Sequence, residues 1–372
     1  MKTETMMENK SDADTPLSEA DNLIESDKIL VSFYQNEIPD FVETELERLY
    51  ANIFASIVKL KSEDRLHDVN VYIARKNSKV QTLLLFHQNK GRIEVLNEVI
   101  KLNSEDIYRF VEAVFTKYKA VTAISFHAIQ IGIVDITYPY QKFDYLEDIV
   151  LSLPDTPEAY FSNLGKNMRN SIKRYQKKID QDFPSYHYEF YEDAGIREQH
   201  VRDIIVLSSA RMAHKKKISL HDDKKTEQLL RLVKTSGLVS VATIEGKVCA
   251  GVICSRSGNN YFMHVVAHDP RYDDYRLGKL FCYRTICQCI RRDGKEFHFL
   301  WGRNEYKYKL LGVHRELNRV AVYRSRMQFF RNGDMALKIA FKGYGRLIKR
   351  WLLDKNRLYG KLAVKLVTPS KT

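Results

Sequence analysis

Residues 238–267 read LVSVATIEGKVCAGVICSRSGNNYFMHVVA, and this stretch decides the fold. It holds three runs rich in β-branched and aromatic residues. Glu245-Gly246 separates the first two runs, and a turn around Gly258-Asn259 separates the last two. Short apolar runs divided by Gly- and Asn-containing turns are typical of antiparallel strands. The sequence therefore predicts a three-stranded meander, at 238–244, 248–254 and 261–267.

A polar loop and a helix follow the meander. Residues 268–276 read HDPRYDDYR, and apolar residues then recur at helical spacing from Gly278 to about Arg292. A strand at 297–301 and a polar cluster at 303–309 come next. Free N–H groups and the positive end of the dipole allow a helix start to hold an anion such as a pyrophosphate. An ordinary β-α-β connection explains the same pattern.

This order of elements resembles the GNAT acyltransferase superfamily. The segment from Gly302 to Lys307 is similar to the Gly-x-x-x-Tyr-Lys signature of its polysaccharide-biosynthesis (CelD-type) acetyltransferase branch, a distant relative of the Fem-type aminoacyl transferases. The basic segment LGKNMRNSIKR at 164–174 resembles the start of that branch, Leu-Gly-x-x-x-Arg-x-x-Ile/Leu-Arg-Arg. The resemblance covers roughly residues 45–325.

The resemblance implies an α/β (α+β) fold of tandem GNAT-like units, with mixed, largely antiparallel sheets flanked by helices. It also implies acetyl-CoA, or another acyl-CoA, as co-substrate and no metal. The GNAT pyrophosphate loop has the pattern Arg/Gln-x-x-Gly-x-Gly/Ala. Here the aligned residues run from Tyr275 to Leu280, and only the central Gly278 fits.

Four regions are predicted along the chain. Residues 1–28 are acidic and poor in apolar residues, which predicts a disordered tail. Residues 29–150 repeat the strand-strand-strand-helix-strand order and are interpreted as a degenerate GNAT-like domain, in which one amphipathic helix spans about 38–60. Residues 151–330 form the predicted catalytic domain, which ends in a strand at 319–324. Residues 331–372 form a basic amphipathic tail.

The net charge of +13 favours an anionic partner, such as a nucleotide cofactor, tRNA, an acidic polymer or a membrane surface. The first residues lack a signal-peptide pattern, and no run approaches the roughly 18 apolar residues of a membrane span. We expect a cytoplasmic protein. The five cysteines are expected to be reduced and buried, and their spacing predicts no zinc site.

Acyl transfer needs a base, a polarised carbonyl and a donor held in line. His264 is a candidate base, although a lone strand histidine is more often a core residue. Glu305, Tyr306 and Lys307 follow a strand end and are the other catalytic candidates; a charged loop is the simpler interpretation. The predicted donor-binding residues are Val265, Val266, Ala267, Tyr275, Arg276, Leu277, Gly278 and Lys279. The predicted acceptor-binding residues are Lys166, Arg169, Lys173, Asp269, Tyr272 and Arg303.

The tail at 331–372 carries eleven Lys or Arg residues against two Asp, together with an apolar stripe. This pattern fits a helix on the inner face of a membrane, and equally a helix docked on the protein's own surface.

Three functions remain open. The first is an acyl-CoA-dependent N- or O-acyltransferase acting on a small molecule or glycan, such as an exopolysaccharide or cell-envelope precursor. The second is a Fem-like transferase that uses aminoacyl-tRNA. The third is a non-catalytic scaffold bound to a membrane polysaccharide synthase.

Overall fold

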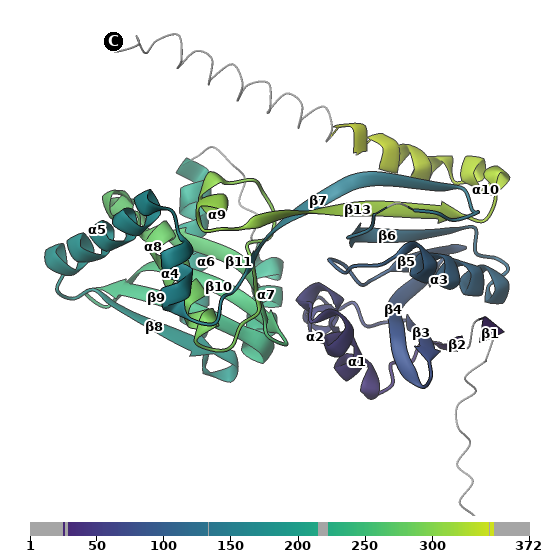
Figure 1. Ribbon diagram of the computed structural model, residues 1–372, viewed down its shortest axis with the longest axis horizontal. Helices are drawn as coiled ribbons and strands as arrows, with labels where there is room; N and C mark the ends of the chain where they lie inside the picture. The colour runs from purple at the N-terminus through teal and green to yellow at the C-terminus, as the bar shows by residue number, and fades with distance from the viewer. Residues whose placement is uncertain (1–24, 27–28, 133, 215–221, 342, 346–372) are drawn as a thin grey trace, which may run out of the picture.

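One mixed sheet runs through the whole molecule. The computed structural model describes residues 25–26, 29–132, 134–214, 222–341 and 343–345. Within these residues the sheet has 13 strands in the order β1-β2-β3-β4-β5-β6-β13-β7-β12-β11-β10-β9-β8. Helices flank it in two lobes (Figure 1). The predicted α/β fold with mixed, largely antiparallel strands is confirmed.

The C-terminal lobe contains the predicted meander. Its strands are β8 (His187–Glu192), β9 (Gly237–Ile244), β10 (Lys247–Ser257), β11 (Asn260–His268) and β12 (Glu296–His298). The crossover helix α8 (Leu277–Ile290) makes β12 parallel to β11. On the same face as α8 lie α4 (Pro157–Asn163) and α5 (Lys166–Asp182), whereas α6 (Glu198–His214) and α7 (Asp223–Ser236) cover the other face.

The N-terminal lobe repeats this order. Its strands are β1 (Glu25–Ser26), β2 (Ile29–Tyr34), β3 (Val69–Lys76), β4 (Lys79–Asn89), β5 (Arg92–Val95) and β6 (Ala123–Ile129). The helix α3 (Ser104–Lys117) crosses between the parallel strands β5 and β6, as α8 does between β11 and β12. The two lobes therefore share one topology.

Two long strands join the lobes by exchange. β13 (Val313–Tyr323) comes from the C-terminal part of the chain but pairs with β6, and β7 (Tyr140–Ser152) precedes the C-terminal lobe but pairs with β12. The two strands also pair with each other over most of their length (Figure 1). The predicted domain boundary at residue 150 falls inside β7. The sequence predicts no strand there, because the segment mixes polar and apolar residues without clear alternation.

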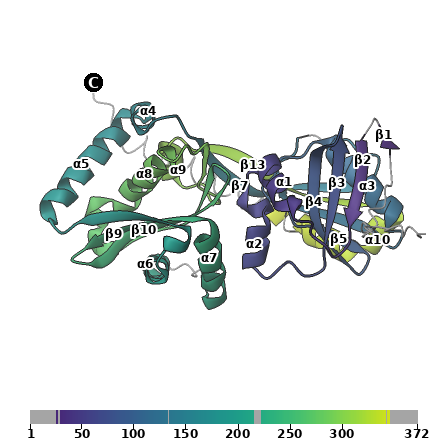
Figure 2. The same cartoon turned by 90° about the horizontal axis from the view of Figure 1, so that it is seen from below.

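The single helix predicted at 38–60 is wrong. The chain forms α1 (Phe41–Tyr50), a 3₁₀ turn η1 (Ile53–Ala55) and α2 (Ile57–Ser62). Ala51 adopts a left-handed φ of 40°, and the side chain of Asn52 caps the new turn. The break places the Phe54 ring against the C-terminal lobe, with its centroid 5.9 Å from that of Phe262, and α2 lies beside α7 (Figure 2).

Four further short helical segments are η2 (Asp193–Gly195), η3 (Pro270–Tyr275), α9 (Glu305–Lys309) and α10 (Arg326–Arg331). A helical stretch at 333–341 follows α10 and packs on β13 through Ala336 and Ile339. The predicted disordered tail, except Glu25 and Ser26, and the predicted basic tail beyond residue 345 lie outside the described residues. Among the helices that are described, none has the length and apolarity required to cross a bilayer.

Candidate functional site

The pairing between β11 and β12 stops early. β12 pairs with β11 only from Asn260–Glu296 to Phe262–His298, whereas β11 continues to His268. At the same point β11 carries a β-bulge, because His264 is inserted where the register with β10 shifts. Bulges end regular pairing and redirect side chains near functional sites. The second half of β11 therefore presents its backbone edge toward residues 299–301 without β-ladder pairing to them.

Lys307 organises residues 299–301 on the other side of this opening. Its buried ammonium Nζ donates to the carbonyl oxygens of Phe299, Leu300 and Trp301, at 2.8, 3.0 and 2.6 Å. Leu300 has a left-handed φ of 53°, so the chain curls around the ammonium. Burial lowers the pKa of Lys307 to about 8. All three N–H donors have acceptors, so the ammonium in this state holds the strand end in place.

The start of α8 lies beside the cations of α5. The N-cap residue Arg276 has a φ of 51° and makes no side-chain cap. Burial would raise the pKa of Tyr175 on α5, but hydrogen bonds from Arg276 and Arg174 outweigh it and lower that pKa. Lys178 lies 4.5 Å from the ring centroid of Tyr275. The positive end of the helix dipole and several guanidinium and ammonium groups therefore share one surface.

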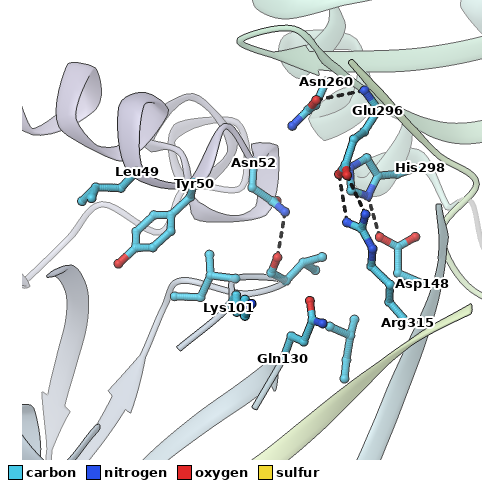
Figure 3. Close-up of a pocket in the computed structure, with 13 residues that line it drawn as sticks. Leu49, Tyr50, Asn52, Lys101, Gln130, Asp148, Asn260, Glu296, His298 and Arg315 are labelled. Carbon is cyan, nitrogen blue, oxygen red and sulfur yellow. Dashed lines mark hydrogen bonds and ion pairs between the residues drawn. The ribbon is translucent and has the colours of Figure 1, made fainter. Parts of the chain in front are cut away.

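A pocket of about 380 Å³ lies between the lobes, beside β12 (Figure 3). Both lobes line it, through Asn52, Lys101 and Gln130 on one side and Asn260, Glu296 and His298 on the other. Its volume lies in the range of small-molecule sites. The pocket adjoins the point where β11 and β12 stop pairing, because His298 is the last paired residue of β12.

A buried histidine and two carboxylates form the polar wall of this pocket. Nδ1 of His298 lies 2.6 Å from Oδ2 of Asp148, and Nε2 lies 3.3 Å from a carboxylate oxygen of Glu296. Arg315 holds Glu296 by two hydrogen bonds, at 2.9 and 2.5 Å. His298 and Asp148 are 3% and 1% exposed. The wall therefore has the base-and-orienting-carboxylate arrangement of general base catalysts.

Neighbouring charges shift the pKa values of His298 and Glu296. Burial alone would lower the pKa of His298, but the hydrogen bonds and charges of Asp148 and Glu296 outweigh burial and raise it. Burial would likewise raise the pKa of Glu296, but His298 and Arg315 outweigh burial and lower it to about 2. Glu296 is thus ionised at neutral pH, and His298 becomes a free base only above its ordinary range.

A known protein family and solved structures resemble this chain in its domain and its fold. Residues 166–308 match the family model described as an acetyltransferase (GNAT) domain. Residues 166–308 therefore form a GNAT-type domain. No curated protein sequence matches the chain significantly. A crystal structure of FemX superposes with a TM-score of 0.61 at 7% identity, covering 80% of this chain and 98% of that one. A conserved protein of unknown function from Bacteroides thetaiotaomicron VPI-5482 superposes with a TM-score of 0.52 at 10% identity, covering 77% and 96%. These likenesses show a shared fold.

The GNAT-type domain brings most predicted donor-binding residues together. Val265, Val266 and Ala267 lie on the second half of β11, although Val265 and Ala267 point into the core beneath α6. Arg276, Leu277, Gly278 and Lys279 form the start of α8, and the Tyr275 hydroxyl donates to Asp182 at 2.7 Å. A Cβ on Gly278 would lie 2.9 Å from Nδ1 of His268, so Gly278 allows the close packing of helix and strand.

The predicted catalytic residues His264, Glu305 and Tyr306 each have separate partners. His264 accepts or donates a hydrogen bond with Ser255 Oγ at 2.7 Å and lies near the Phe54 ring. Tyr306 is largely buried beside Phe299, and burial raises its pKa. Glu305 is exposed and pairs with Lys309 at 2.8 Å. Their catalytic roles stay predictions.

The predicted acceptor-binding residues do not form one group. Lys166 is exposed at the start of α5, Arg169 donates to two carbonyls at the end of α4, and Lys173 lies over the Phe161 ring. Asp269 caps η3, and its pKa is lowered chiefly by Arg271. Tyr272 packs on Phe183, while Arg303 pairs with Glu147. None of these six residues lines the pocket between the lobes.

Asp148, Glu296, His298 and Arg315 are not among the site residues predicted from the sequence. One signal was present: Glu296 and His298 alternate with Phe297 and Phe299 in a strand that the element order places inside the sheet. Polar side chains on one face of an internal strand need buried partners. The partner of His298 is Asp148, 150 residues earlier in the chain, and the partner of Glu296 is Arg315 on the later strand β13, so the sequence did not reveal them.

Proposed function

We propose that this protein is an acyltransferase that binds its donor along the second half of β11 and its acceptor in the pocket between the lobes. The observation that supports the proposal is that β12 adjoins both the part of β11 that it leaves unpaired and the pocket. His298 lies at the point where β11 loses its partner, and it faces a pocket lined by both lobes.

The donor in this proposal is an acyl-CoA. An extended pantetheine can hydrogen-bond to the backbone edge of β11, as a strand would. The pyrophosphate then reaches the start of α8, where the dipole and the side chains of Arg174, Arg276 and Lys279 provide positive charge. Lys307 keeps residues 299–301 curled away from β11.

The transfer uses His298 as the general base. In its neutral form His298 takes the proton from a hydroxyl or amine of the acceptor through Nε2, while Asp148 holds Nδ1. The acceptor oxygen or nitrogen attacks the thioester carbonyl, the C–S bond breaks, and the imidazolium returns the proton to the leaving thiolate. Tyr306 is a weaker proton donor for this step, because burial raises its pKa.

A glycan or polysaccharide precursor is the proposed acceptor. The resemblance at 302–307 and 164–174 to the CelD-type branch supports this choice, and the polar lining of the pocket suits a sugar. Lys101 and Gln130 supply ammonium and amide donors of the kind that bind hydroxyl groups, whereas the amides of Asn52 and Asn260 already bond to the carbonyls of Val99 and Ala51.

Aminoacyl-tRNA is the alternative donor, and the form of α5 favours it. This helix has 17 residues, about 25 Å long, and exposes Lys166, Lys173, Arg174, Lys177 and Lys178. This row of cations is longer than is needed to bind one pyrophosphate, and it could contact several phosphates of a nucleic-acid backbone.

Calorimetry with acetyl-CoA, CoA and tRNA tests the donor. The variant Arg276→Ala removes a charge at the start of α8 without the clash that any larger residue at Gly278 produces. Lys247→Ala, in the exposed β9–β10 hairpin, is the matched charge control. We expect Arg276→Ala to weaken CoA binding about tenfold and Lys247→Ala to leave it unchanged.

The outcomes separate the three functions. tRNA binding that weakens steeply with salt, without CoA binding, would identify the aminoacyl-tRNA alternative. A chain that binds neither CoA nor tRNA would contradict the transferase proposal and leave the scaffold. A Gly278→Glu variant would test the same helix start less clearly, because its side chain would disturb the packing against His268 whether or not a ligand binds there.

A further inference from the structure

A second pocket, of about 660 Å³, lies in the N-terminal lobe. Its floor is the face of β4, β5, β6 and β13 that points away from α3, and its wall is α10 with the helical residues that follow. Arg92 fixes this wall, because its guanidinium donates to Asn332 and, bidentately, to Asp334. The pocket is therefore built from elements that are held together.

Cations dominate the lining. Lys90, Arg92, Arg319 and Arg331 line the pocket, and Glu94 is the carboxylate among its lining residues. Asp334 neutralises Arg92, and Glu94 lies 3.7 Å from Arg65 outside the lining. The charges of Lys90, Arg319 and Arg331 therefore lack a carboxylate partner among the ion pairs of the described residues, and the pocket is net positive.

Two buried nitrogen atoms on the floor lack hydrogen-bond partners. Nε of Arg319 and Nε2 of His87 are buried and have no hydrogen-bond partner in the part of the chain that the structure describes. Arg319 stacks over the Tyr145 ring, with its Cζ 5.9 Å from the centroid, which fixes its direction. Buried donors without acceptors are costly, so a ligand with acceptor oxygens would satisfy them.

The topology makes this pocket the counterpart of the one between the lobes. β5 and β6 occupy the positions that β11 and β12 hold in the C-terminal lobe, since each pair is parallel and joined by a crossover helix. By their register with the preceding strand, Ala123 and Ser125 on β6 correspond to Glu296 and His298 on β12. Arg319 on β13 then stands where β7 places Asp148. The second pocket thus repeats the first with a cation in place of the carboxylate.

We infer that the N-terminal lobe is a second binding site, which takes a phosphate-bearing group between Arg319, Arg331 and Lys90. Guanidinium groups bind phosphate oxygens bidentately, and a phosphate supplies the acceptors that Arg319 and His87 need. The inference is independent of the proposed transfer reaction, because no residue of β11, α8 or β12 takes part in it.

Such a phosphate can come from a soluble molecule or from a lipid headgroup. The wall exposes Met327, Phe330, Leu337 and Phe341, which are 64%, 77%, 71% and 83% exposed. Their spacing places them along one side of the wall, so a lipid-borne phosphate could be reached from a membrane surface. The experiment therefore includes both sources.

Pyrophosphate binding to the full-length protein tests the site. Calorimetry measures affinity, and hydrogen exchange locates the protected segments at 87–94 and 319–332, separately from the start of α8. Arg331→Ala and Arg319→Ala should each weaken binding at this site at least tenfold. Arg326→Ala, on the same helix but outside the lining, should change it less than twofold. Arg331 is exposed, so its variant reports on binding even if Arg319→Ala disturbs folding.

Vesicles of phosphatidylglycerol, with phosphatidylcholine as control, distinguish the source. Flotation with phosphatidylglycerol that pyrophosphate inhibits and Arg331→Ala weakens would identify a lipid headgroup. Pyrophosphate binding without flotation would identify a soluble ligand. The inference is overturned if neither probe protects these segments, or if Arg331→Ala and Arg326→Ala bind pyrophosphate equally well.

Discussion

Oδ2 of Asp148 lies 2.6 Å from Nδ1 of His298, although 150 residues separate them and they come from different lobes of the predicted domain division. β7 carries Asp148 across to the C-terminal lobe, where it pairs with β12. The strand exchange that joins the lobes thus also assembles the candidate base. Folding of the whole sheet is therefore a condition for the site.

The pH dependence of transfer should report on His298. Asp148 and Glu296 raise its pKa above the ordinary 6.5, so the rate should fall as the pH drops through that raised value. His298→Gln should lower kcat about 100-fold or more and abolish this fall of the rate at low pH, the acidic limb of the pH–rate profile. Glu296→Gln removes one of the charges that raise the pKa, so the limb should move to lower pH. A limb that stays in place in Glu296→Gln would contradict the role of His298.

The same shift should appear in stability. A histidine whose pKa is raised on folding contributes stability that is complete below about pH 6.5 and is lost as the pH rises through the folded-state value. We expect the free energy of unfolding of the wild type to fall across this window, relative to that of His298→Gln. Urea denaturation at several pH values measures this difference. Free energies of unfolding that change in parallel with pH in the two proteins would contradict the expectation.

Lys307 should be important for stability. In Lys307→Met, three buried carbonyl groups lose their donor, which should cost about 3–5 kcal/mol. Lys309→Met is the matched control, because Lys309 pairs only at the surface with Glu305 and should lose less than about 1 kcal/mol. Urea denaturation at pH 7 compares them, and equal losses would show that the three bonds are not stabilising.

Gly251 on β10 should tolerate no side chain. A Cβ there would lie 2.3 Å from two atoms of Ile204 on α6, so Gly251→Ala should destabilise the protein by about 1–3 kcal/mol. Gly333 provides the opposite case, since nothing lies within 4 Å of its added Cβ and it is helical. Gly333→Ala should leave stability unchanged or raise it by about 0.5 kcal/mol. Thermal unfolding of both variants checks the pair.

The sequence determined the local elements of the C-terminal lobe. The meander at 238–267 and the helix after Gly278 follow from apolar periodicity and turn residues, and these signals are short-range. The strand predicted at 297–301 is confirmed only at its start, because β12 ends at His298 and the carbonyls of residues 299–301 bond to Lys307 instead. The same signals predicted that a polar loop precedes α8. They failed at 38–60, where one left-handed residue, Ala51, broke an apparently continuous helical pattern.

Only the tertiary structure decided which strands meet and which polar side chains share a pocket. β7 and β13 lack clear alternation because they are central strands whose polar residues, such as Asp148 and Arg315, find buried partners on β12. The partner of a buried charge is set by strand order and register, which depend on contacts more than 100 residues apart. Periodicity in the sequence reports on which face a residue occupies and contains no information on that distant partner.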